Sequence, residues 1–196
     1  KVRGYGIPVL SDVHAVTEVD DAAEVLDVLQ LPAHLSMQTD LTVALARAGK
    51  PLNIKKGQFL APGDMQAVVR KIESAGNENI LLTERGSCFG YHDLVADMRS
   101  LPEMRRIGYP VIFDATHVVR LYGRPSSEAQ GGTPENIAPL ARAAVATGCD
   151  AVFIETHPHI SEALCDAASM LPLDQLESLL EQLLDISQVV RRHGVV

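Results

Sequence analysis

Residues 51–56 read Pro51-Leu52-Asn53-Ile54-Lys55-Lys56, a short apolar stretch that ends in two lysines. A helical pattern with apolar residues three and four positions apart follows at 64–74. A second apolar stretch, at 80–85, ends in an arginine. This order of strand, helix and strand predicts a βαβ unit, in which the two strands run parallel and the helix covers one face of the sheet.

The same alternation extends along the whole chain and predicts six βα units. Four glycines fall between a helix and the next strand, where a helix often ends in a left-handed residue. The strands are expected at 7–13, 25–33, 51–56, 80–85, 110–116 and 151–157, and the clearest helices at 38–48, 64–74 and 176–190. The glycines are Gly49, Gly76, Gly108 and Gly148.

Both an open doubly wound sheet and a (β/α)8 barrel have this order of elements, and the polar residues favour the barrel. An open sheet usually gathers its site at one switch point. Here every predicted strand has polar residues at its carboxyl end, as expected for a barrel whose site is built from all the loops that follow strands. The sequence therefore predicts an α/β fold with six of the eight units of a (β/α)8 TIM barrel, in a single partial domain over residues 1–196.

Composition and charge exclude several classes of protein. The 196 residues are 46% hydrophobic and 21% charged, as in an ordinary globular domain. The net charge of −8 argues against a surface that binds nucleic acid, and no apolar run is long enough to span a membrane. The first residues lack the apolar stretch of a signal peptide, and the three cysteines are widely spaced, so we expect reduced thiols in a cytoplasmic protein.

Strand alternation places Lys55 on the interior face of its strand, whereas Lys56 is expected to be structural or to face solvent. Arg85 ends the next strand, and a lysine and an arginine that converge can bind a phosphate or a carboxylate. In the alternative interpretation, these two cations pair with Asp12 or Glu84 in a stabilising network. The spacing alone does not decide between the two.

A second set of residues could hold a metal ion. His117, Glu155 and Asp166 are one histidine and two carboxylates, a combination that binds Mn²⁺, Fe²⁺ or Zn²⁺. The three are far apart in sequence, so an uncharged histidine that is hydrogen-bonded to a carboxylate is the alternative interpretation. Cys165, beside Asp166, could be a further ligand, but we expect a lone buried thiol.

Longer motifs follow one another over about residues 7–190. They include Pro8–His14, Asp27–Ala33, Gln38–Leu41, Asn53–Phe59, Thr83–Gly86, Asp97–Ser100, Phe113–His117 and Glu155–Pro158. In this order they resemble the 3-deoxy-D-manno-octulosonate 8-phosphate synthase family. The resemblance implies that the six units correspond to the third to eighth units of that family's barrel.

The resemblance implies a transferase that forms a carbon–carbon bond. Phosphoenolpyruvate, D-arabinose 5-phosphate and water would give 3-deoxy-D-manno-octulosonate 8-phosphate and inorganic phosphate, a step of lipopolysaccharide biosynthesis. The expected partners are these small molecules, with no nucleic acid and no membrane. Because family members are tetramers, a cytoplasmic homotetramer is expected.

The resemblance also assigns roles to residues at the strand ends. Asp12, His14, Gln30 and Lys55 would be catalytic, and Lys55, Arg85, Gln30 and Asp114 would bind substrate. His117, Glu155 and Asp166 would be ligands of a divalent metal such as Mn²⁺, Fe²⁺ or Zn²⁺, or would form the same cage without metal in the metal-independent class.

The chain departs from the family's pattern at several positions. The family's first two strands, with a Lys-Ala-Asn-Arg stretch and a Cys or Asn that completes the metal cage, have no counterpart here. Met37 stands where an arginine is usual and His34 where a phenylalanine is usual, and the 120–136 loop lacks much of the usual Gln- and Arg-bearing pattern. A second hypothesis is therefore a catalytically impaired or inactive relative that keeps the scaffold as an anion-binding or interaction protein.

Overall fold

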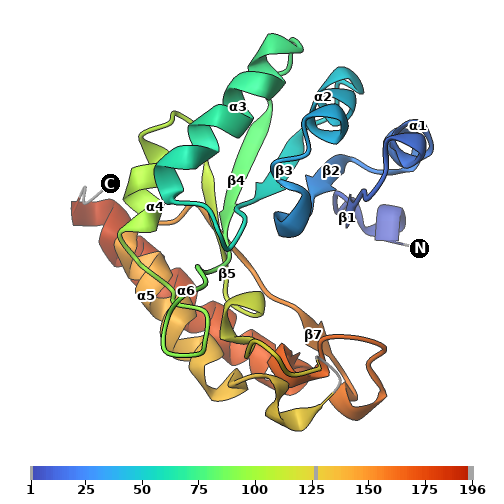
Figure 1. Ribbon diagram of the computed structural model, residues 1–196. Coiled ribbons are helices and arrows are strands. Elements are labelled where there is room, and N and C mark those ends of the chain that lie inside the picture. Colours follow the sequence, from blue (N-terminus) through green and yellow to red (C-terminus); the bar gives the residue numbers. More distant parts are fainter. Residues whose placement is uncertain (1, 126–127, 194–196) are drawn as a thin grey trace.

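A curled sheet of parallel strands forms the centre of the computed structural model, which describes residues 2–125 and 128–193 (Figure 1). The six strands lie in the order of the chain, each hydrogen-bonded to the next. They are β1 (Leu10–Asp12), β2 (Val28–Leu31), β3 (Leu52–Lys55), β4 (Ile80–Glu84), β5 (Val111–Asp114) and β6 (Ala151–Phe153). This order confirms the predicted parallel arc and excludes a doubly wound sheet.

The principal helices cover the outer side of the arc (Figure 1). Helix α3 shows why, because its apolar residues Met65, Val68, Val69 and Ile72 are all buried. Together with the apolar face of the strands they form the core, as expected of a sheet covered by amphipathic helices. The helices are α1 (Val19–Val25), α2 (Thr39–Arg47), α3 (Met65–Ser74), α4 (Ser100–Arg105), α5 (Ile137–Thr147) and α6 (Leu173–His193).

The helix ends agree with the sequence prediction. Gly148 is the residue that ends α5, and its φ of 100° lies in the left-handed region that favours glycine. The other three predicted glycines also have positive φ values. No helix among the described residues is both long enough and apolar enough to span a membrane.

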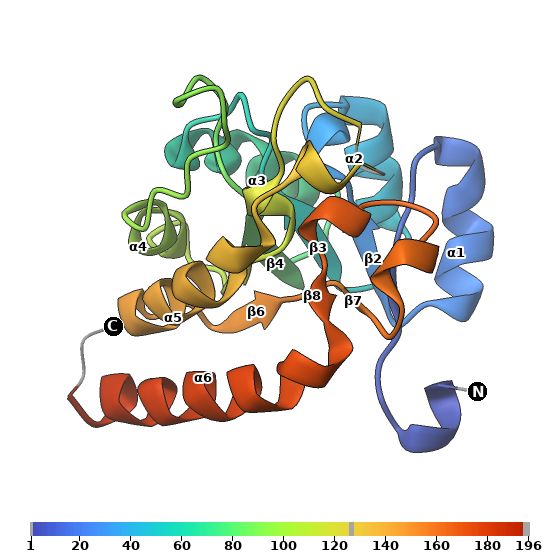
Figure 2. The same ribbon diagram turned by 90° about the horizontal axis from the view of Figure 1, so that it is seen from below.

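The prediction of a single last strand at 151–157 is wrong in its second half. The strand β6 ends at Phe153, and the chain leaves the sheet at Glu155, whose backbone amide donates to Thr116 Oγ1. Residues Thr156–His157 form β7, which pairs with β8 (Leu171–Pro172) in a separate two-stranded sheet. Figure 2 shows this small sheet beside β6, with α6 running along α5 below it. Among the described residues, β1 and β6 each have a strand partner on one side only.

Lys56 is fully buried, so its structural interpretation is confirmed and the solvent-facing one is wrong. Its Nζ donates to the carbonyl of Leu60 over 3.1 Å and to Ser87 Oγ over 3.1 Å, and lies 3.6 Å from Glu84 Oε1. The side chain thus joins the loop after β3 to the loop after β4. These two loops border the carboxyl ends of the strands.

Replacement of Lys56 with methionine is expected to lower the free energy of unfolding by about 3–5 kcal/mol, because it leaves the buried carboxylate of Glu84 without its cation. Urea unfolding followed by circular dichroism would measure this change. Adding Glu84→Gln should restore part of the lost stability, since the second change removes the unpaired charge. A double variant less stable than Lys56→Met alone would contradict this account.

Candidate functional site

A chain of hydrogen bonds crosses the interior face of the first four strands. Thr83 Oγ1 donates to Asn53 Oδ1 over 2.6 Å, and Asn53 Nδ2 donates to Gln30 Oε1 over 2.7 Å. Gln30 Nε2 in turn donates to Asp12 Oδ1 over 2.6 Å. In each of these bonds the later strand provides the donor and the earlier strand the acceptor. The row of hydrogen bonds therefore fixes the orientation of the Asn53 and Gln30 amides, and it ends on the Asp12 carboxylate.

Lys55 lies next to this layer, on the interior face as predicted. Its Nζ is 2.8 Å from Asp114 Oδ2 and 3.8 Å from the centre of the Phe153 ring. The alternative that paired Lys55 with Asp12 or Glu84 is wrong, because the partner is Asp114. A curled sheet explains the pair, since the interior residues of β3 and β5 approach each other across the end of β4.

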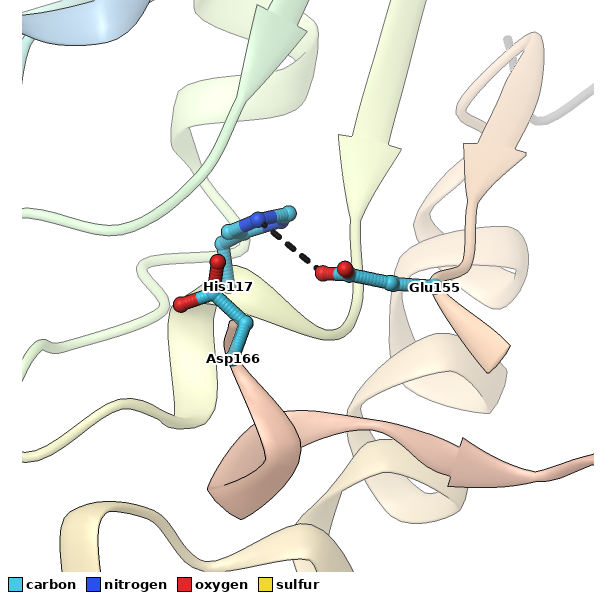
Figure 3. A group of neighbouring side chains, drawn as sticks. All are labelled: His117, Glu155 and Asp166. Carbon is cyan, nitrogen blue, oxygen red and sulfur yellow. Dashed lines mark ion pairs between the residues drawn. The ribbon is translucent and has the colours of Figure 1, made fainter. Parts of the chain in front are cut away.

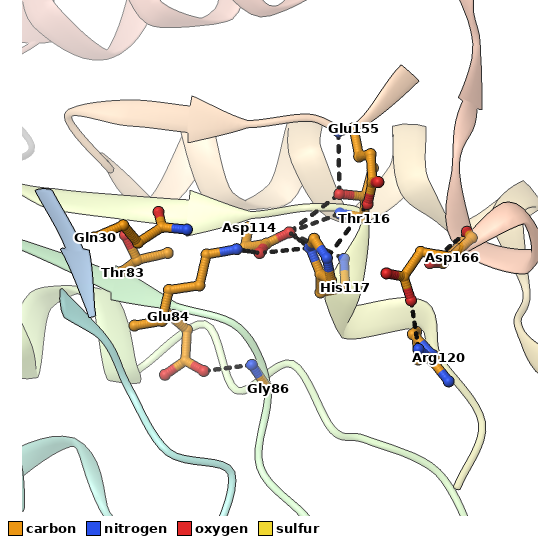
Figure 4. A network of polar contacts seen from close by, with 12 residues as sticks. Gln30, Thr83, Glu84, Gly86, Asp114, Thr116, His117, Arg120, Glu155 and Asp166 are labelled. Carbon is orange, nitrogen blue, oxygen red and sulfur yellow. Dashed lines mark hydrogen bonds and ion pairs between the residues drawn. The ribbon is translucent and has the colours of Figure 1, made fainter. Parts of the chain in front are cut away.

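Asp114 is the centre of the polar network (Figure 4). Its fully buried Oδ1 accepts hydrogen bonds from the backbone amides of Thr116 and His117 and from Thr116 Oγ1. His117 Nδ1 lies 2.9 Å from Oδ2 and 3.1 Å from Oδ1. Burial alone would raise the pKa of Asp114, but the hydrogen bonds and charges of His117 and Lys55 hold this pKa well below its usual range. Asp114 therefore stays ionised and orients the side chains of both Lys55 and His117.

The predicted metal-ligand set comes together in space (Figure 3). His117, Glu155 and Asp166 each offer one ligand atom, and these atoms lie within 4.8 Å of one another. His117 Nε2 is 3.3 Å from Glu155 Oε2, a buried oxygen that accepts no well-formed hydrogen bond among the described residues. Burial, together with the charge of Asp166, raises the pKa of Glu155, while the charge of His117 opposes the rise. An unsatisfied buried oxygen beside an imidazole nitrogen is an arrangement that a cation would stabilise.

The cavity beside this cluster contains an unpaired cation. It has a volume of about 180 Å³ and is lined in part by His34, Gln58, Arg85 and Arg120. Arg85 is 7% exposed, and no carboxylate of the described residues forms an ion pair with it. Burial lowers the pKa of Arg85, yet a guanidinium remains charged at neutral pH. A buried cation that faces a cavity is suited to an anionic ligand.

The remaining predicted residues lie at the margin of the site. Asp12 and His14 are exposed at the edge strand, and the His14 side chain takes no part in the hydrogen bonds of the described network. Cys165 is exposed, so the expectation of a buried thiol is wrong. The next residue, Asp166, adopts a left-handed backbone, with φ at 51°.

Two residues near the cluster were not predicted from the sequence. Arg120 forms an ion pair with Asp166, and Phe153 lies under the Lys55 ammonium. The signal for Phe153 was present, because strand alternation places it on the same face as Glu155. Arg120 follows His117 by one turn of the 3-10 helix His117–Val119, a spacing that could have grouped the two.

The fold and the site define a class: α/β proteins of barrel type, in which polar groups from successive strands meet at the carboxyl ends of a curled parallel sheet. The chain belongs to the DAHP synthetase I family, whose model matches residues 2–192.

Several relatives are named 2-dehydro-3-deoxyphosphooctonate aldolase. The one from Trichlorobacter lovleyi is 58% identical over 189 residues, which are 96% of this chain and 69% of the relative. The relative from Geobacter sp. (strain M21) is 56% identical over 97% of this chain and 69% of its own length. That from Stenotrophomonas maltophilia is 54% identical over 98% of this chain and 69% of its own length. These matches confirm the resemblance drawn from the sequence motifs.

Proposed function

We propose that this protein is an enzyme that condenses phosphoenolpyruvate with D-arabinose 5-phosphate and water. The products are 3-deoxy-D-manno-octulosonate 8-phosphate and inorganic phosphate. The observation that carries the proposal is the buried Arg85 guanidinium, which lines a cavity and has no carboxylate partner among the described residues. It lies near enough to Asp114, the partner of Lys55, to interact with its charge. The names of the relatives, at 54–58% identity, support the same reaction.

The reaction needs an anionic substrate held still against an aldehyde. A carbon–carbon bond forms between the methylene carbon of phosphoenolpyruvate and the aldehyde carbon, and the aldehyde oxygen takes up a proton. The oxygen of water ends on the former enol carbon, and phosphate leaves. In our proposal Arg85 and Lys55 bind the phosphate and carboxylate of phosphoenolpyruvate, and this orientation lowers the barrier. Asp114 is proposed to assist by orienting Lys55.

The hydrogen-bonded layer gives the other predicted residues their proposed roles. Gln30 is fixed between Asn53 and Asp12, so its amide presents a defined edge to a substrate in the barrel mouth. Asp12 and His14 are proposed to act near the reacting atoms from the edge strand. Their exposure fits a place that a substrate or a further part of the barrel would cover.

The cluster of His117, Glu155 and Asp166 fits a divalent metal such as Mn²⁺, Fe²⁺ or Zn²⁺. When bound, such an ion would polarise the aldehyde or position the water. The contact of His117 Nδ1 with Asp114 supports this role, because a proton on Nδ1 leaves the lone pair of Nε2 directed at the cluster. The metal-independent alternative, in which the same residues form a cage without an ion, remains part of the proposal.

We also propose the wider organisation of the protein. The six units correspond to the third to eighth units of an eight-unit barrel, with residues 1–196 as a single partial domain. Two observations support this arrangement. The edge strands β1 and β6 are each paired on one side only among the described residues, and the chain matches 69% of the length of the relatives. A homotetramer in the cytoplasm is the proposed assembly, as the resemblance to a family of tetramers suggests.

The test is an assay of phosphate release by the purified protein, with any further residues that its gene encodes. We expect one phosphate per molecule of eight-carbon product when both substrates are present, and no release when arabinose 5-phosphate is omitted. Mass spectrometry of the product would identify the new carbon–carbon bond. Binding of phosphoenolpyruvate without turnover would favour the inactive relative, the second hypothesis.

A further inference from the structure

One ligand of the proposed metal cluster is already paired with a cation. Arg120 Nη1 forms an ion pair with Asp166 Oδ1, and Figure 4 shows the guanidinium directed at this carboxylate. The two side chains are 26% and 20% exposed, so water screens the pair only in part. An ion that enters the cluster would therefore meet a carboxylate whose charge is largely balanced.

The packing of two loops holds this pair in place. Arg120 forms a β-bridge with Gly132, and a Cβ on Gly132 would lie 2.3 Å from the carbonyl oxygen of Ala168. The segment that carries Arg120 therefore lies directly against the loop that carries Asp166. That loop is fixed in turn, because the Asp166 carbonyl accepts hydrogen bonds from the amide and hydroxyl of Ser169. The ion pair thus belongs to the fold and is not a chance surface contact.

We propose that Arg120 competes with a divalent cation for Asp166 and so weakens metal binding at the cluster. The proposal rests on the metal cluster of the proposed function. A neutral histidine with two carboxylates supplies a charge of −2, which matches a divalent ion, and Arg120 cancels half of this charge before the ion arrives.

A different role for Arg120 predicts the opposite result. If Arg120 served only to orient Asp166 as a ligand, removing it would weaken metal binding, as the loss of an orienting partner usually does. Under competition, removing it strengthens metal binding. The direction of the change therefore distinguishes the two roles, and a simple loss of structure would not strengthen binding.

The experiment is a titration of the full protein with Mn²⁺, in which electron paramagnetic resonance measures the free ion. We expect Arg120→Gln to bind Mn²⁺ about 10-fold more tightly than the unchanged protein, or better, because a full carboxylate charge becomes free for the ion. Arg124→Gln is the matched control: Arg124 lines the same cavity but forms no ion pair with Asp166, so its Mn²⁺ affinity should stay within about twofold. Arg120→Lys keeps the charge and should stay closer to the unchanged protein than Arg120→Gln.

A second background tests whether the effect passes through Asp166. In Asp166→Asn the carboxylate is gone, so adding Arg120→Gln should change Mn²⁺ affinity by less than about twofold. Unchanged or weaker binding by Arg120→Gln in the otherwise unchanged protein would overturn the proposal. So would an absence of Mn²⁺ binding in every variant, and that result would leave the condensation reaction to be judged by phosphate release alone.

Discussion

Replacing Lys55 with methionine is expected to reduce the rate of phosphate release by about 10²–10³-fold, the usual cost of losing one charged group that stabilises a reacting substrate. The same change should lower the free energy of unfolding by about 3–5 kcal/mol. Both effects have one origin. Lys55 Nζ is 2.8 Å from the fully buried carboxylate of Asp114, which loses its ammonium partner in the variant.

A second variant separates the loss of stability from the loss of chemistry. In Lys55→Met with Asp114→Asn the unpaired charge is removed, so part of the stability should return. Phosphate release should remain low, because no ammonium group is left to bind the substrate. Full activity in the double variant would show that Lys55 serves only to neutralise Asp114, and the proposed role in substrate binding would then be wrong.

Replacing Arg85 with glutamine is expected to weaken the binding of phosphoenolpyruvate by about 2–5 kcal/mol, that is by a factor of about 30 or more. Unlike Lys55, Arg85 has no ion-pair partner among the described residues, so its removal leaves no carboxylate unpaired. The free energy of unfolding should therefore change by less than about 1 kcal/mol. Loss of binding without loss of stability is what distinguishes a ligand-binding arginine from a structural one.

Calorimetry with phosphoenolpyruvate would measure the affinity, and urea unfolding would measure the stability. Arg99→Gln is the matched control, because the Arg99 side chain is 88% exposed and pairs with Asp97 at the surface. This control should bind phosphoenolpyruvate as the unchanged protein does. Equal affinity of Arg85→Gln and Arg99→Gln would exclude Arg85 from the binding site.

The sequence by itself determined the order of the elements and, within the strands that formed as predicted, the face on which a residue lies. The period of two along 51–56 placed Lys55 inward, and its contacts with Asp114 and the Phe153 ring confirm this. Apolar stretches that alternate with helices predicted the parallel sheet, whose strands follow chain order. Such features depend on residues close together in the chain, so a local pattern is enough to reveal them.

Local patterns were not enough at the end of the sheet. The stretch 151–157 reads as one strand, but it divides at Glu155 because the amide of that residue binds Thr116 and its carbonyl accepts the amide of Leu171. These partners come from the preceding βα loop and from the strand before α6. Nothing within 151–157 indicates either of them, since each depends on where other segments lie.

Only the tertiary structure decided which charges meet. Lys55 and Asp114 are 59 positions apart, and Arg120 and Asp166 are 46 apart. The sequence suggested Asp12 or Glu84 as partners of Lys55 and suggested no partner for Arg120, whereas the structure pairs Lys55 with Asp114 and Arg120 with Asp166. Strands β3 and β5 are separated by β4, so their interior side chains approach each other only because the sheet curls. Strand periodicity tells on which face of the sheet a residue lies. It does not tell which residue becomes its ion-pair partner, because that depends on distances between strands of the curled sheet.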